Sequence, residues 1–176
     1  MDSRGFTALA RGDARVLVLG SLPGAESLRQ RRYYAQPRNA FWPIMGALFG
    51  AAPERPYEAR VRKLLARRVA VWDVCKRAHR SGSLDSSIDR DSIVVNDFAS
   101  FIASHPGLRL ICFNGATAAA LYRRLVLPGL AARAAASPTR RLPSTSPAYA
   151  ALSFAAKLEA WAPVALAAGP TRGGRR

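Results

Sequence analysis

The chain has 176 residues, of which 49% are hydrophobic, and this length and composition suit one domain with a single sizeable core. Lysine and arginine number 27 against 11 acidic residues, which gives a formal net charge of +16. No apolar run reaches the roughly 18 residues of a membrane span, and no apolar signal core opens the chain, so we expect a cytoplasmic protein with no membrane partner.

Apolar runs alternate with helical stretches along the chain. Strands are predicted at residues 15–19, 69–74 and 108–113, with a weaker one at 131–136. Helices are predicted at residues 41–49, 57–68, 96–104, 116–125 and 148–161. This order predicts an α/β fold in a single domain, residues 1–162, with a central four-stranded parallel sheet flanked by helices on both faces. Residues 163–176 end in Gly, Pro and Arg, and we expect them to form a basic, flexible tail.

The turn after the first strand is the first candidate binding segment, because ligands of parallel sheets bind at the carboxyl ends of the strands. It reads Gly20-Ser21-Leu22-Pro23-Gly24. Its glycines and proline predict a tight turn that either serves only as a turn or brings backbone N–H groups close to a ligand. It matches neither the Walker loop nor the dinucleotide pattern GxGxxG, so nucleotide cofactors lose support.

A second candidate segment, YYAQPRNAFW, spans residues 33–42. It holds four aromatic residues and one asparagine, Asn39, and it is either part of the core or a face for a flat ring-shaped ligand. Phe41 and Trp42 open an apolar stretch that is typical of a helix packed against the core, so we assign these two residues to the core.

Polar residues also follow the other predicted strands. Asp73 and Asp85 are candidate bases after the second strand, although each also suits a loop or a helix cap. Asn114 ends the third strand, where its amide could read the edge of a nucleobase or could simply take the unusual backbone angles of a turn.

The segment before the last predicted helix carries two arginines, three hydroxyls and two prolines. The polar residues are Arg140, Arg141, Ser144, Thr145 and Ser146. Hydroxyls and N–H groups at the start of a helix bind phosphate, and they also serve as ordinary helix caps. Both functions are compatible, so this loop is a candidate phosphate site.

The charge favours a polyanion such as a nucleic acid as the partner. Of the 27 cations, 24 are arginine, whose planar guanidinium suits phosphate oxygens, although a compositional bias with solvated arginines is the alternative.

Cys75 and Cys112 are too few for a four-thiolate iron–sulfur cluster, and each lies in an apolar stretch that predicts a buried free thiol. His79 and His105 are remote from them in sequence, so we expect no metal site and place both histidines at the surface.

Four motifs, taken together and in this order, resemble the uracil-DNA glycosylase superfamily, and most of all its hypoxanthine-DNA (deoxyinosine) glycosylase branch. They are GSLPG, YYAQPRNAFW, FNG at 113–115 and RLPSTSPAYA at 141–150, within a resemblance that spans residues 15–161. The resemblance implies a monofunctional DNA glycosylase domain at residues 1–162. Such an enzyme flips a deaminated base out of DNA and hydrolyses its N-glycosidic bond, leaving an abasic site. Hypoxanthine is the expected base, with uracil and xanthine as further candidates.

The resemblance also implies roles for individual residues. In mismatch-specific relatives an asparagine stands at the position of Leu22 and places the attacking water, so here the expected catalytic residue is Asn39. Many relatives carry histidine at the position of Gln36, and classical uracil-DNA glycosylases carry one in the last motif, where this chain has Ser144-Thr145-Ser146.

Base binding is expected from Gly20, Ser21, Leu22, Tyr34 and Asn114, with Tyr34 as the stacking surface and Asn114 as the reader of the base. DNA backbone contacts are expected from Arg140, Arg141, Ser144, Thr145 and Ser146. Asp73 or Asp85 is the fallback if a true base takes part. The enzyme is expected to act as a monomer without a cofactor. The alternatives are a DNA- or damage-binding protein of the same fold that does not cut, and an enzyme acting on a free nucleoside or nucleotide.

Overall fold

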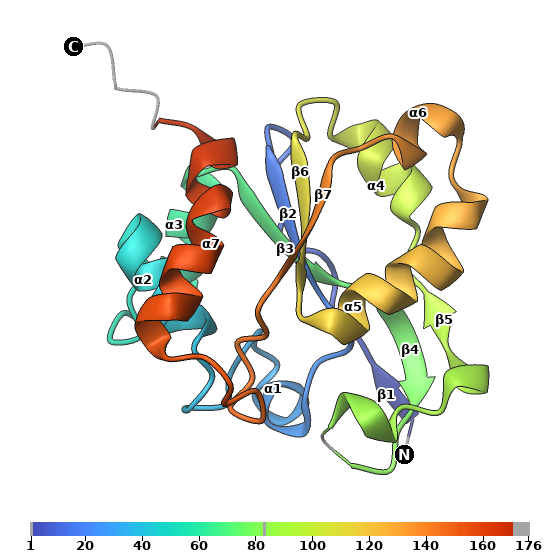
Figure 1. The fold of residues 1–176 in the computed structure, drawn as a ribbon, viewed down its shortest axis with the longest axis horizontal. Helices are drawn as coiled ribbons and strands as arrows, with labels where there is room; N and C mark the ends of the chain where they lie inside the picture. The colour runs from blue at the N-terminus through green and yellow to red at the C-terminus, as the bar shows by residue number, and fades with distance from the viewer. Residues whose placement is uncertain (1, 83, 171–176) are drawn as a thin grey trace.

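A parallel sheet runs through the centre of the computed structural model, which describes residues 2–82 and 84–170 (Figure 1). Within those residues the sheet has four strands in the order β3-β2-β6-β7, and each neighbouring pair is parallel. The strands are β2 (Val16–Gly20), β3 (Val69–Asp73), β6 (Leu110–Asn114) and β7 (Thr139–Leu142). The predicted four-stranded parallel sheet is therefore confirmed.

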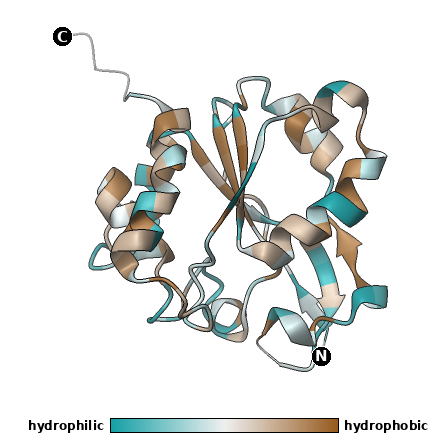
Figure 2. Cartoon of the chain, in the orientation of Figure 1, coloured by the Kyte–Doolittle hydropathy of each residue, from teal (hydrophilic) through white to brown (hydrophobic). Residues whose placement is uncertain are grey.

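The central strand β2 explains why the sheet is covered on both faces. All five of its residues are buried, and their side chains alternate between two clusters of apolar residues. Val16 and Val18 belong to one cluster, whereas Leu17 and Leu19 belong to the other. Figure 2 shows these hydrophobic strands between the helices on either side.

Helices cover both faces, as predicted (Figure 1). One face carries α2 (Phe41–Phe49), α3 (Tyr57–Ala66) and α7 (Phe154–Ala168). The other carries α4 (Phe98–Ser104), α5 (Ala116–Leu121) and α6 (Ala132–Ala135). Helix α5 continues into a π-helical turn, Tyr122–Val126, and a 3₁₀ turn, Leu127–Gly129. A further helix, α1 (Ala25–Gln30), follows the turn after β2.

A second, smaller sheet was not predicted. It consists of β1 (Asp2–Arg4), β4 (Cys75–His79) and β5 (Val94–Val95), paired antiparallel in the order β1-β4-β5. Short 3₁₀ turns at Asp85–Ser87 and Arg90–Ser92 lie between β4 and β5. The three strands are short, and β4 has no regular alternation of buried and exposed residues, so neither feature gives a strand signal in the sequence.

Two predicted elements were placed wrongly. The weak strand predicted at residues 131–136 is helix α6, because five alanines around Arg133 favour a helix, and the fourth strand is β7 instead. The last helix begins at Phe154, where the Ser153 hydroxyl accepts a hydrogen bond from the Ala156 N–H, and not at residue 148.

The same helix includes the first residues of the segment predicted to be a flexible tail. It continues past Pro163 to Ala168, and both Val164 and Ala168 are buried, so residues 163–168 are helical and packed against the core. The last six residues of the predicted tail, 171–176, lie outside the described part of the chain. No helix among the described residues is long and apolar enough to cross a membrane.

The cysteines are buried free thiols, as predicted, but one of the two histidines is not at the surface. His79 is exposed, with Nδ1 3.2 Å from Asp2 Oδ1. His105 is buried, its ring stacks on Phe101 at a centroid distance of 4.1 Å, and its Nδ1 lies 2.7 Å from the Phe101 carbonyl oxygen. The surface assignment of His105 was wrong, because its ring packs back onto the preceding turn of its own helix.

Trp161 joins the last helix to the core and to the loop after β7. It is fully buried, its ring meets Phe41 edge-to-face at 6.1 Å, and its Nε1 donates a hydrogen bond to the Pro143 carbonyl oxygen at 3.0 Å. We expect Trp161→Ala to lower the free energy of unfolding by about 3–5 kcal/mol, because it leaves a large cavity and an unpaired carbonyl. Urea denaturation measures this loss.

Leu166 on the same helix provides the control, since it is 79% exposed. Leu166→Ala is expected to change the free energy of unfolding by less than about 0.5 kcal/mol. Equal losses in the two variants would contradict the role given to Trp161.

Candidate active site

A cavity of about 750 Å³ opens at the carboxyl ends of β2, β3 and β6. The chain leaves β2 toward β3 on one side and returns to β6 on the other, so the cavity lies at the topological switch point of the sheet. The predicted site residues that line it are Gly20, Ser21, Leu22, Tyr34, Asn39, Asn114, Ser144, Thr145 and Ser146. Gln36, Asp73 and Asp85 line it as well. Segments far apart in sequence therefore meet at one place.

Arg140 and Arg141 do not line this cavity. They are exposed on β7, the edge strand of the sheet, next to Cys112 and Phe113 of β6. Any contact that they make with a nucleic acid would therefore lie beside the cavity, at the start of the loop that closes it.

The turn after β2 presents its backbone to the cavity and its leucine to the core. The carbonyl oxygens of Gly20 and Ser21 accept hydrogen bonds from the N–H groups of Val74 and Cys75, so the turn is fixed against the chain that follows β3. Leu22 is only 5% exposed and packs against the core, and its side chain has no polar group that could hold a water. A Cβ at Gly20 would lie 2.5 Å from the Asp73 carboxylate, so this close approach requires glycine.

Tyr34 and Phe41 form a stacked pair at the wall of the cavity. Their rings lie 3.9 Å apart with an interplanar angle of 20°, and Phe41 is fully buried behind Tyr34. Tyr34 has a φ of 53°, a strained value for a residue with a side chain, so its surroundings must hold it in place. Its buried hydroxyl has no hydrogen-bond partner among the described residues.

The side chain of Asn39 has a fixed orientation at the start of α2. Its Oδ1 accepts a hydrogen bond from the Phe41 N–H at 2.9 Å, which requires the oxygen, and not the nitrogen, on that side. The Nδ2 group is therefore the part of the amide that is left to act as a donor. The backbone of the same turn is tied down, because the Ala40 N–H donates to the Thr145 carbonyl oxygen at 2.9 Å.

Asn114 holds Thr145 through both atoms of its amide. Its Nδ2 donates to Thr145 Oγ1 and its Oδ1 accepts from the Thr145 N–H, each at 2.8 Å. Thr145 is 1% exposed, so in this structure its hydroxyl supports the loop and does not face solvent. Gly115 follows with a φ of 98°, and a Cβ there would come within 3.0 Å of the Ser144 side chain.

Ser144 and Ser146 shape the rest of the loop after β7. The Ser144 hydroxyl accepts from the Ser146 N–H, and the Ser146 hydroxyl accepts from the Ala148 N–H, each at 3.2 Å. Both serines remain partly exposed at the cavity, unlike Thr145. Of the hydroxyls of Ser144, Thr145 and Ser146, those of the two serines are therefore open to the cavity.

A charged cluster lies beneath the turn after β2. Asp73 is 3% exposed, and burial together with the negative charge of Asp85 raises its pKa to about 8. The Ser21 hydroxyl donates to Asp85 Oδ1 at 2.5 Å, and Arg80 is 3% exposed with its Nη2 donating to the Pro23 carbonyl oxygen. Arg80 was missed in the sequence, because one arginine among 24 carries no signal that it is buried.

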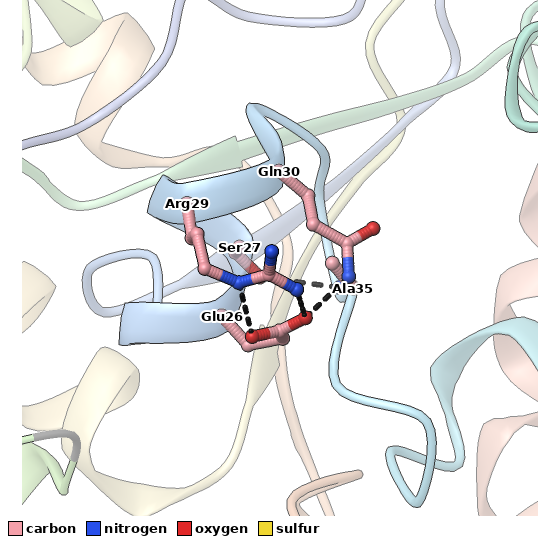
Figure 3. A network of polar contacts seen from close by, with 5 residues as sticks. All are labelled: Glu26, Ser27, Arg29, Gln30 and Ala35. Atoms are coloured by element: carbon pink, nitrogen blue, oxygen red, sulfur yellow. Dashed lines mark hydrogen bonds and ion pairs between the residues drawn. The ribbon is translucent and has the colours of Figure 1, made fainter.

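Helix α1 carries a further polar network at the rim (Figure 3). The Glu26 carboxylate accepts hydrogen bonds from Arg29 and Gln30, and the contact with Arg29 lowers the pKa of Glu26 to about 2. Ser27 Oγ accepts from the Ala35 N–H at 3.2 Å, which fastens the helix to the residue after Tyr34. Glu26 lines the cavity, but its oxygens are engaged within its own helix.

The contacts of Asn114 generate a test of its role. We expect Asn114→Ala to lower the free energy of unfolding by about 1–3 kcal/mol, because the buried Thr145 N–H and hydroxyl lose their partner. Urea denaturation of this variant, of Thr145→Val and of the double variant forms a cycle, and the losses should be clearly less than additive. Unchanged stability, with an altered preference between hypoxanthine and uracil as leaving base, would show that Asn114 reads the base and does not mainly hold the loop.

Comparison with known proteins agrees with this geometry. The family model of the uracil DNA glycosylase superfamily matches residues 6–165. A protein named hypoxanthine DNA glycosylase from Methanosarcina acetivorans is 42% identical over 116 residues, which are 65% of this chain and 72% of that protein. A protein of the same name from Methanosarcina barkeri is 34% identical over an alignment of the same length and coverage.

A solved structure extends the similarity to nearly the whole chain. It is the solution NMR structure of a Methanosarcina acetivorans protein provisionally described as a uracil DNA glycosylase. It superimposes with a TM-score of 0.78 at 36% identity and covers 96% of this chain and 100% of that one. The chain belongs to the uracil-DNA glycosylase superfamily.

Proposed function

We propose that the protein is a monofunctional DNA glycosylase that removes hypoxanthine from DNA and leaves an abasic site, with uracil and xanthine as further candidate bases. One observation carries the proposal. A stacked aromatic pair and the oriented amide of Asn39 lie at a single cavity at the switch point of the sheet, in a chain of this superfamily. The two related proteins that carry the name hypoxanthine DNA glycosylase support the choice of base.

Base excision requires an extruded base, a surface on which it stacks, and donors for the leaving base. The Tyr34 ring, supported from behind by Phe41, is a flat surface of this kind. The N–H groups of the turn at Ser21 and Leu22 are the candidate donors to the edge of the base. A closed, dry pocket strengthens such contacts as negative charge develops on the departing base.

The hydrolysis also requires a placed water, and we assign that task to Asn39. Its oxygen already accepts from Phe41, so the Nδ2 group would hold the water through the water's oxygen. An amide is a weak base, so the contribution is the placement of the nucleophile, and the cationic sugar supplies the driving force for its attack.

The DNA backbone is expected to meet the loop after β7. Ser144 and Ser146 would contact the phosphates that flank the flipped nucleotide, and the exposed Arg140 and Arg141 would contact the backbone beside the cavity. With a net charge of +16, the protein should bind DNA less tightly as the salt concentration rises, and the decrease should be steep.

We infer that the enzyme acts as a monomer, since one chain builds the whole cavity, and that it works where chromosomal DNA lies, in the cytoplasm.

A panel of lesions tests the proposal. Duplexes that differ only in one hypoxanthine, uracil or xanthine are incubated with the protein and then cleaved with alkali at abasic sites. We expect hypoxanthine to be removed fastest, and no strand break before alkali. Binding to all three duplexes without any abasic site would instead favour a DNA- or damage-binding protein that does not cut.

Asn39→Ala tests the role of the amide. We expect the single-turnover rate on hypoxanthine to fall by about 100-fold or more, with binding to abasic DNA retained, because the water loses its position while the DNA contacts remain.

Gln36→Ala is the matched control, because Gln36 lies in the same turn and its side chain also accepts a hydrogen bond from the local backbone, that of Arg38. We expect it to slow excision by less than about fivefold. If the two variants slow the reaction equally, the amide of Asn39 serves the turn and the water is placed elsewhere.

A further inference from the structure

Asp73 is a buried acid that the proposed steps do not yet use. It ends β3, is 3% exposed and lines the cavity, and its Oδ2 has no hydrogen-bond partner among the described residues. Its position is fixed, because its backbone carbonyl accepts a hydrogen bond from Asn96 Nδ2 at 2.8 Å. A buried polar atom left without a partner is costly, so its retention at a cavity points to a ligand that completes it.

The second carboxyl oxygen of Asp73 packs against the turn that is expected to meet the base. A Cβ at Gly20 would lie 2.5 Å from Asp73 Oδ1 and 3.3 Å from the hydroxyl of Tyr34. The carboxyl group and the stacking ring therefore meet at the same backbone position. A base that stacks on Tyr34 would bring its edge toward Asp73.

The surroundings keep this carboxyl protonated at neutral pH. Burial, followed by the negative charge of Asp85, raises the pKa of Asp73 to about 8. The charge of Arg80 and the nearby hydroxyl of Tyr33 act in the opposite direction, and they do not overcome the burial. Asp73 is therefore a neutral donor below a pH of about 8.

One thiol and two phenol groups around Asp73 do not change charge in this range. Burial raises the pKa of the Cys75 thiol to about 12, and it raises the pKa values of the Tyr33 and Tyr34 hydroxyls above their ordinary values. All three groups stay protonated while Asp73 loses its proton. A change in activity near pH 8 can therefore be assigned to the carboxyl.

A neutral acid in this place has a chemical use that depends on the leaving base. Hypoxanthine is a purine, and its imidazole ring carries N7, which has a lone pair and can accept a proton. Uracil offers no comparable ring nitrogen. Proton transfer to a leaving group typically accelerates a reaction by about 10²–10⁴-fold.

We propose that Asp73 is the general acid that donates its proton to N7 of the departing hypoxanthine, and that this makes the site selective for a purine leaving group. The inference rests on the proposed function, since it names the acid of that same reaction. The C1′–N9 bond breaks and its electron pair passes to the base, while the Asp73 proton moves to N7. Hypoxanthine leaves as a neutral tautomer. Water then bonds to C1′ and releases a proton to solvent, and the Asp73 carboxylate regains a proton from solvent.

The pH dependence of single-turnover excision is the first readout. Activity needs the acid form, so the rate of the unaltered protein should be high at pH 6–7 and fall as pH rises through about 8. Asp73→Asn should excise hypoxanthine about 100-fold or more slowly at pH 7 and lose this fall, because an amide cannot give up a proton. Asp85→Asn should move the fall to lower pH, because it removes a charge that raises the pKa of Asp73.

A modified substrate is the second readout. In 7-deazahypoxanthine a carbon replaces N7, so no proton can be accepted there. We expect the unaltered protein to prefer hypoxanthine over the 7-deaza analogue, and this rate ratio should fall at least about tenfold in Asp73→Asn. The exposed Asp13, which does not line the cavity, supplies the matched control Asp13→Asn, which should keep the ratio and the pH profile.

The pH dependence of thermal stability reports the protonation state of Asp73 independently of activity. A folded-state pKa of about 8 against an ordinary value of 3.8 means that stability falls as pH rises from about 4 to 8. Asp73→Asn removes this loss, so the increase in Tm that it causes should be larger at pH 9 than at pH 5.

The outcomes separate the two proposals. Excision of hypoxanthine with an unchanged ratio and pH profile in Asp73→Asn would overturn the role of Asp73 alone. No excision by the unaltered protein would overturn the proposed function, and the acid with it.

Discussion

Thr145 is the residue on which the site depends. Its N–H and its hydroxyl are both bound by the Asn114 amide at the end of β6, and its carbonyl oxygen accepts the Ala40 N–H. One buried residue thus joins the sheet, the loop after β7 and the turn that carries Asn39. The hydrogen bonds are short and shielded from water, so the three segments keep their relative positions. The cavity exists because these segments are held together.

The second constraint is close packing at Gly20. This glycine lets the Asp73 carboxyl approach the turn after β2, and it leaves the Tyr34 hydroxyl beside the same point. The arrangement is unfavourable in itself, since Asp73 Oδ2 and the Tyr34 hydroxyl are buried with no hydrogen-bond partner among the described residues, and Tyr34 has a positive φ. Energetically unfavourable features of this kind are common where a ligand completes the structure, and these features all lie at one wall of the cavity.

The central sheet could be predicted because its strands are continuous apolar runs. The edge strand β7 could not, since Thr-Arg-Arg-Leu has only one buried residue and gives no apolar signal. The small antiparallel sheet was not predicted, for a similar reason. Its longest strand, β4, has no regular alternation of buried and exposed residues, and its shortest, β5, has two residues. The last helix was placed too early, since the cap at Ser153 is one of several serines and threonines in that segment.

At the site, the sequence identified most of the lining residues but not their partners. Strand ends and motifs led to Asn39, Tyr34 and Asn114, all of which line the cavity. That the Asn114 amide binds Thr145, 31 residues later, depends on the pairing of β6 with β7, which no local pattern contains. The burial of Arg80 and the raised pKa of Asp73 likewise arise only when β3, β4 and the turn after β2 come together.

Hydrolysis of the bond between hypoxanthine and deoxyribose transfers the oxygen of a water molecule to the sugar and leaves the base without it. Mass spectrometry of the products formed in ¹⁸O-labelled water tests this reaction directly. We expect free hypoxanthine without label, and an uncut strand whose abasic sugar carries one ¹⁸O at C1′, after allowance for slow exchange of the sugar aldehyde. Absence of free base, or a covalent adduct between protein and DNA with a broken strand, would contradict this reaction.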